Sequence, residues 1–199
     1  MSRGEEEEMY YHASPVKDIN VLEPRISNHG IPFIYFSKKR ENVLVYLGNA
    51  VEKYCKETNF LYDGIWQKWA AYGFNEDGRQ RIEEYYSNAL EKTYKGVEGY
   101  VYMTEEIEEA DFQTQIPDAA TSSAAVKVTG VEFVPDAYEA ILEAEKQGLL
   151  TIDRYEEMTE RRKEWLRKTI KKEYADAINH PEYRHFLKGN FSDILEKLN

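Results

Sequence analysis

The spacing of apolar residues changes from strand-like to helical within one short segment near the N-terminus, and this change constrains the fold most. Residues 32–37 form an apolar run of strand-forming residues. From residue 43 onward the apolar residues recur at helical spacing and define one face: Val43, Leu44, Leu47, Ala50, Val51 and Tyr54. A strand and an amphipathic helix in direct succession must bury their apolar sides against a common core. The segment therefore predicts a mixed α and β domain.

The rest of the chain extends this pattern without a regular strand–helix alternation. Apolar runs predict strands at residues 9–14, 99–103, 125–134 and 149–155. Helical spacing predicts helices at residues 78–92, 136–146, 159–178 and 192–198. Asp136 and Glu139 form a capping box, and Gly148 ends the helix that it opens. This order indicates an α+β fold with antiparallel strands rather than a doubly wound parallel sheet.

The 199 residues are enough for one well-packed domain, and we expect three segments. Residues 1–8 contain four consecutive glutamates and are expected to be a disordered acidic end. Residues 9–155 are expected to form the α+β domain, and residues 156–199 a helical extension packed on it. The aromatic stretch at residues 60–74 fits either short strands or a bent helix. Residues 105–123 read as a polar loop.

Charge and cysteine content exclude several classes of function. The net charge of -11 argues against non-specific nucleic-acid binding, which needs a basic face. The one cysteine, Cys55, leaves no disulfide framework and no cysteine-based zinc site, so we expect a cytoplasmic protein without a metal. No apolar run approaches the length of a membrane span, so we expect no membrane partner.

Three aromatic or imidazole side chains and one carboxylate form a chemically suggestive set. His12 precedes Ser14 by two positions on the first expected strand, and Tyr35 lies in the string Ile34-Tyr35-Phe36-Ser37. Tyr46 follows Tyr35 by eleven positions, on the expected helix. Two stacked aromatic rings attract a flat cation, and a histidine can fix hydroxyl and amide groups beside it. A carboxylate would then stabilise an oxocarbenium-like transition state, as in glycoside hydrolysis.

These residues resemble the H-Y-E class of the ADP-ribosyltransferase fold, which includes diphtheria-toxin-like toxins and poly(ADP-ribose) polymerases. His12 and Ser14 match the first motif, Tyr35 and Tyr46 the second, and Glu132 in Val131-Glu132-Phe133-Val134 the third. The resemblance covers residues 9–55 well and the strand around Glu132 loosely. Position 130 is Gly, so the Gln/Glu-x-Glu signature of arginine-modifying relatives is absent.

The resemblance implies a split antiparallel β core with flanking helices, and cleavage of the nicotinamide–ribose bond of NAD. Nicotinamide would lie between Tyr35 and Tyr46, His12 would hold the ribose and carboxamide, and Glu132 would stabilise the developing charge. Arg25 is a candidate for the pyrophosphate, because a guanidinium can grip phosphate oxygens by two parallel bonds; a solvated loop arginine is the alternative. The acceptor would be a protein, a nucleic acid, a small molecule or water.

Simpler explanations and other functions remain open. Tyr46 lies on an apolar helix face where core packing alone explains it, and Glu139 or Glu106 fits the carboxylate role in another register. One alternative is a non-enzymatic protein on the same fold that binds a partner, or a second copy, through residues 60–72 and the C-terminal helices. Another is an NAD-dependent RNA 2′-phosphotransferase, whose basic pocket would draw on Lys17, Arg25, Lys38, Lys39 and Arg40.

Overall fold

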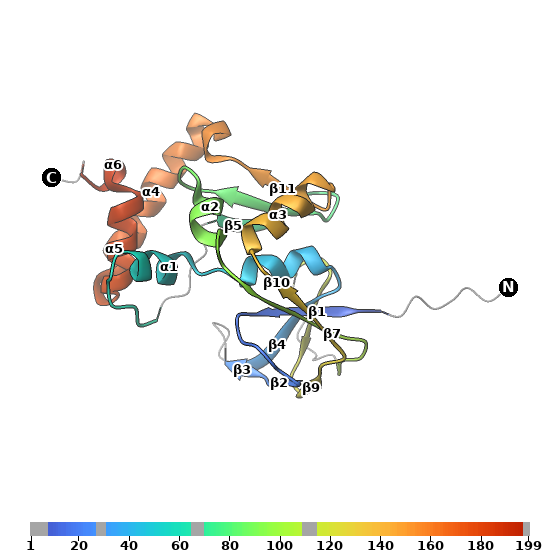
Figure 1. Ribbon diagram of the computed structural model, residues 1–199. Coiled ribbons are helices and arrows are strands. Elements are labelled where there is room, and N and C mark those ends of the chain that lie inside the picture. The colour runs from blue at the N-terminus through green and yellow to red at the C-terminus, as the bar shows by residue number, and fades with distance from the viewer. Residues whose placement is uncertain (1–7, 27–30, 65–69, 109–114, 197–199) are drawn as a thin grey trace. The chain divides into compact units, whose positions relative to one another are not determined.

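The computed structural model describes residues 8–26, 31–64, 70–108 and 115–196. The chain is an α+β protein with antiparallel sheets and helices at its C-terminal end, which confirms the expected class (Figure 1). It divides into two compact units, each assembled from several segments. Unit 1 comprises residues 1–47, 74–80 and 96–150, and unit 2 comprises residues 48–73, 81–95 and 151–199.

Unit 1 is built on an antiparallel sheet with the strand order β10-β7-β1-β4-β3. These strands are β1 (Tyr10–Ser14), β3 (Arg25–Ile26), β4 (Pro32–Ser37), β7 (Gly99–Thr104) and β10 (Gly130–Val134), and β8 (Ala119–Ser122) pairs with β4. The pairing places His12 opposite Tyr102, and Tyr102 opposite Val131. The strands expected at residues 9–14, 32–37 and 99–103 are confirmed. The strand expected at residues 125–134 is instead two strands, β9 (Val126–Lys127) and β10.

One face of this sheet carries a buried aromatic and aliphatic cluster. Its buried members are Tyr10, Leu22, Ile34, Phe36, Tyr102, Ala120 and Val126. Leu22 and Val126 come from a two-stranded ribbon of β2 (Val21–Leu22) and β9, where they lie directly opposite each other. Alternation along each strand explains the cluster, because every second residue of β1, β4 and β7 points to the same side.

Among its described residues, unit 1 contains two helical elements, and the second of them begins at a local sequence signal. The 3₁₀ helix η1 spans Arg40–Tyr46, and α3 spans Ala137–Lys146. The Asp136 side chain accepts hydrogen bonds from the backbone amides of Tyr138 and Glu139, which confirms the expected start of α3.

The continuous helix expected across residues 43–54 is wrong, because the chain forms η1 and then α1 (Ala50–Glu57). Asn49 is extended and caps α1 by accepting a hydrogen bond from the amide of Glu52. A strong N-cap residue starts a new helix, so it interrupts the earlier helical turns. Tyr46 is consequently the last residue of a 3₁₀ helix.

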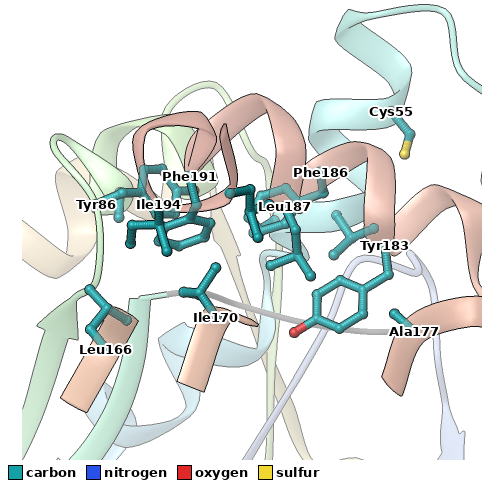
Figure 2. Packing of buried hydrophobic residues seen from close by; sticks show 14 residues of the cluster. Cys55, Tyr86, Leu166, Ile170, Ala177, Tyr183, Phe186, Leu187, Phe191 and Ile194 are labelled. Atoms are coloured by element: carbon teal, nitrogen blue, oxygen red, sulfur yellow. The ribbon is translucent and has the colours of Figure 1, made fainter. Parts of the chain in front are cut away.

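Unit 2 contains most of a three-stranded sheet and a helical layer. The sheet has the order β11-β6-β5, from β11 (Leu150–Asp153), β6 (Gln80–Glu84) and β5 (Ala70–Phe74). The helices are α1, α2 (Ala89–Tyr94), α4 (Glu160–Asp176), α5 (Pro181–Asn190) and α6 (Ser192–Leu195), with 3₁₀ turns η2 (Tyr155–Glu157) and η3 (Ala177–Asn179). Figure 2 shows their shared core, in which Phe186, Leu187 and Phe191 meet Leu166 and Ile170 of α4.

Two expectations in unit 2 are wrong for separate physical reasons. Residues 80–84 form β6 instead of the first part of a helix over residues 78–92, because pairing with two neighbouring strands outweighs the helix propensity of Gln, Arg and Glu. The sequence predicts no helix between residues 178 and 192, but α5 fills this interval and Pro181 opens it at its first position, where a missing amide hydrogen costs nothing. The expected aromatic interface at residues 60–72 includes residues 65–69, which lie outside the described residues.

Candidate functional site: a cavity beside His12

The site residues expected near the N-terminus meet at one cavity of unit 1. This cavity has a volume of about 510 Å³, within the range of roughly 300–1,000 Å³ typical of small-molecule sites. His12 and Ser14 of β1, Arg25 of β3 and Tyr35 of β4 all line it. The remaining wall comes largely from residues 16–23, which are the loop after β1, the strand β2 and the residue that follows it. Four of the six expected site residues are therefore neighbours of one cavity.

The cavity lies where β1 and β4 separate. The two strands pair where Tyr11 lies opposite Ser37, and this is their single register pair among the described residues. One residue further along β1, the His12 side chain connects the two strands by a hydrogen bond, with its Nδ1 atom 2.9 Å from the carbonyl oxygen of Tyr35. The ring also meets Phe36 edge-on, with 6.0 Å between ring centroids. A side chain thus bridges the two strands in place of a backbone bond.

The bond to Tyr35 fixes the tautomer of His12, and burial fixes its charge state. A carbonyl oxygen can only accept a hydrogen bond, so Nδ1 carries the hydrogen and donates it to Tyr35. Burial lowers the pKa of His12, the bond to Tyr35 offsets part of this effect, and the positive charge of Arg25 lowers the pKa further. The ring is therefore neutral near pH 7, and its Nε2 atom is a hydrogen-bond acceptor.

A buried tyrosine holds the loop that forms the cavity wall. The Tyr102 hydroxyl donates a hydrogen bond to the carbonyl oxygen of Val16 over 2.6 Å. It also accepts a bond from the amide of Ile19 over 3.3 Å. Tyr102 lies opposite His12 on the neighbouring strand, so both side chains emerge on the same sheet face. No local sequence signal identifies this role, because the partners are more than 80 positions away.

Four charged side chains line the cavity, and none of them forms an ion pair with a residue that the structure describes. Lys17 and Arg25 are cationic, Asp18 and Glu23 are anionic, and all four line the cavity. None of them forms a salt bridge with a described residue. Asp18 also adopts a left-handed backbone conformation with a φ of 59°, which Asp and Asn tolerate better than most residues. The cavity therefore offers charges of both signs to a ligand.

Glu132 lies on the other face of the sheet. It is opposite Val101 on β7, and Val101 is opposite Ala13 on β1, so its side chain points away from the face of His12. The Glu132 carboxylate accepts two hydrogen bonds from Arg40 of η1, at 2.7 Å from Nε and 2.5 Å from Nη2. Glu132 does not line the cavity, and its carboxylate serves in a two-pronged ion pair.

The two tyrosines of the expected aromatic slot have different surroundings. Tyr35 is half-buried and is among the residues that line the cavity. Alternation along β4, however, directs its ring, with that of Phe33 at 6.3 Å, to the sheet face opposite the one that Phe36 shares with His12. Tyr46 is 36% exposed at the end of η1 and is not among the residues that line the cavity. The structure thus brings His12, Ser14, Arg25 and Tyr35 together and leaves Tyr46 and Glu132 outside their cavity.

Within residues 8–26, 31–64, 70–108 and 115–196, no three His, Cys, Asp or Glu side chains are placed to hold a metal ion. No helix in that part of the chain has the length and hydropathy of a membrane span. Comparison of the chain with protein-family models, curated proteins and solved structures finds no match.

Proposed function

We propose that this protein binds NAD in the cavity beside His12, on a split antiparallel core of the ADP-ribosyltransferase type. The observation that carries the proposal is the opening between β1 and β4, bridged by the neutral His12 ring and lined by Ser14, Arg25 and Tyr35. The acceptor atom Nε2 suits a ribose hydroxyl, and the Arg25 guanidinium suits a pyrophosphate oxygen.

The proposed reaction is cleavage of the nicotinamide–ribose bond, with transfer of ADP-ribose to an acceptor or to water. It needs a carboxylate near the ribose to stabilise positive charge in the transition state. Glu132, the carboxylate expected from the sequence, points to the opposite sheet face and is bonded to Arg40. Asp18 and Glu23 line the cavity and are the carboxylates available to that role.

The first experiment measures NAD binding by isothermal titration calorimetry. We expect wild-type protein to bind NAD with a Kd below about 1 mM, which corresponds to about -4 kcal/mol. Arg25→Gln should weaken binding by about tenfold, the effect of losing about 1.4 kcal/mol of phosphate contact. Arg161→Gln removes the same charge from the exposed side of α4 and serves as the matched control. Absence of NAD binding at millimolar concentration would overturn the proposal.

The second experiment measures nicotinamide release from NAD by wild-type protein and three carboxylate variants. We expect Asp18→Asn or Glu23→Gln to abolish release and Glu132→Gln to leave it unchanged, because only the first two side chains line the cavity. Loss of release in Glu132→Gln alone would assign the reaction to a different arrangement of β10. Release by none of the proteins, with NAD still bound, would contradict the transfer reaction.

That last outcome would favour a second function, a non-enzymatic protein that binds NAD as a ligand. The specific observation behind it is the Arg40–Glu132 ion pair, because Glu132 is the carboxylate that the family resemblance assigned to catalysis. The RNA 2′-phosphotransferase alternative gains less support, because Lys38 and Lys39 form salt bridges with Glu8 and Asp118 and do not line the cavity.

A further inference from the structure

A second cavity lies wholly within unit 2, and its wall carries side chains of both charges, which can bind the two charged ends of a small zwitterion. It has a volume of about 290 Å³, at the small end of the range for ligand sites. Carboxylates and guanidinium groups line it together, and they come from the ends of β6 and β11, from η2 and from the start of α4. Its wall includes Glu83, Glu84, Arg154, Glu157, Thr159 and Arg162.

The two buried glutamates of β6 differ in how their charge is balanced. Glu83 accepts hydrogen bonds from Arg81, Arg162 and Tyr85, so two guanidinium groups balance its charge. Glu84 is only 5% exposed, yet it meets no cation among the described residues. Its Oε1 atom accepts a bond from the amide of Leu90 at 2.8 Å, and the one contact of Oε2 with a described residue is a long one of 3.5 Å with the amide of Tyr155.

An unbalanced carboxylate in a buried position is costly unless a cation completes its surroundings. Oε1 accepts the bond from Leu90 and so anchors the first turn of α2. A carboxylate oxygen can accept two hydrogen bonds, so Oε2, with its one long contact, can accept another. A single available oxygen suits an ammonium group, which acts as a point charge, better than a guanidinium fork that needs two oxygens. Glu157 in the same wall adds further negative charge.

The other part of the wall suits a carboxylate. Arg162 donates one hydrogen bond to Glu83, from its Nη2 atom. A guanidinium group has five N–H hydrogens to donate. Arg154 also lines the cavity. Thr159, another wall residue, is the N-cap of α4, and the first turn of a long helix favours a negative group. Cationic and anionic side chains thus line one cavity that has the size of a small metabolite.

We propose that this cavity binds a free α-amino acid, with the ammonium group at Glu84 and the carboxylate near Arg154 and Arg162. The proposal is independent of NAD binding, because every wall residue belongs to unit 2 and the NAD cavity belongs to unit 1. The amino acid would rigidify the junction of β6, η2 and α4, whose charged groups it would complete.

The test is a nuclear magnetic resonance titration of the full chain with alanine, N-acetylalanine and alaninamide. The two derivatives remove the ammonium charge and the carboxylate charge in turn, so they test the chemistry without any mutation. We expect alanine to shift the amide signals of Thr159 and Arg162 with a Kd below about 10 mM, and each derivative to bind at least about tenfold more weakly. Binding of either derivative as tightly as alanine, or no shift at about 50 mM alanine, would overturn the proposal.

A pair of variants locates the ammonium site. Glu84→Gln keeps the size and the acceptor oxygen of the side chain and should weaken alanine binding by about tenfold. Glu156→Gln removes the same charge from a neighbour outside the cavity wall, which bonds Ser87, and should bind alanine within about twofold of wild type. Equal binding by both variants would refute the role of Glu84. If Glu84→Gln fails to fold, the comparison of alanine with its derivatives still decides the proposal.

Discussion

Replacement of Tyr102 by Phe tests whether one hydroxyl holds the wall of the NAD cavity. The ring is fully buried, and Phe keeps its shape, so the change creates no cavity and removes only the oxygen. The carbonyl of Val16 and the amide of Ile19 each lose their partner. A net hydrogen bond contributes about 0.5–1.5 kcal/mol, so two lost bonds give a range of about 1–3 kcal/mol.

Two structural details narrow that range. Val16 is half exposed, so water can replace the hydroxyl at its carbonyl oxygen. The bond from Ile19 is long, at 3.3 Å, and contributes less than a bond of ideal length. We therefore expect the free energy of unfolding to fall by about 1–2 kcal/mol, which lowers Tm by roughly 2–4 °C per kcal/mol for a chain of this length.

Urea unfolding of the wild type and Tyr102→Phe measures this loss, and amide hydrogen exchange at Ile19 shows whether the loop has loosened. Tyr100→Phe is the matched control, because Tyr100 points to the same face of β7 and its hydroxyl bonds none of the described residues. We expect Tyr100→Phe to change stability by less than about 0.5 kcal/mol. An equal effect of both substitutions, or unchanged exchange at Ile19, would refute the role assigned to the Tyr102 hydroxyl.

Three further predictions concern other parts of the chain. Because burial lowers the folded-state pKa of His12 below its ordinary value of 6.5, stability present above pH 6.5 should be lost as the pH falls below it, and thermal melts of His12→Gln should show a smaller loss. Gly189→Ala should destabilise the chain by about 1–3 kcal/mol in urea unfolding, since a Cβ there would lie 1.8 Å from the Tyr54 hydroxyl; a gain in stability, as helix propensity alone predicts, would contradict the packing. Glu83→Gln should cost about 1–3 kcal/mol in the same assay, because it removes the buried anion bonded to Arg162 and Arg81, while Arg81 keeps Asp153 and solvent reaches both guanidinium groups; an unchanged free energy of unfolding would contradict a structural role for this carboxylate.

Local signals explain which elements were predictable from the sequence. The strands β1, β4 and β7 combine strand-forming residues with clear boundaries, and α3 begins at an N-cap residue whose side chain bonds the first-turn amides. Residues 80–84 misled the prediction because Gln, Arg and Glu favour helices in isolation. Their burial as β6 depends on strands that lie far away in the sequence.

In the candidate site, too, the residues close together in the sequence were predictable and the distant one was not. His12, Ser14, Arg25 and Tyr35 lie within 24 positions of one another, and short connections between adjacent strands bring them to one cavity. The position of Glu132 depends on the register of β10 against β7 and of β7 against β1. A shift of one residue in either register would reverse the face to which Glu132 points, and no sequence pattern fixes that register.

The sequence by itself determined the α+β class, the strand that carries His12 and Ser14, the strand that carries Tyr35 and the N-cap of α3, because each depends on residues close together in the chain. Only the tertiary structure decided that Glu132 pairs with Arg40, that the Tyr102 hydroxyl holds the loop beside His12, and that Glu84 lies buried with no cation among the described residues as its partner. These contacts join residues far apart in the chain or depend on burial by the whole fold. Their geometry is set by strand register and by packing, which local propensity does not encode.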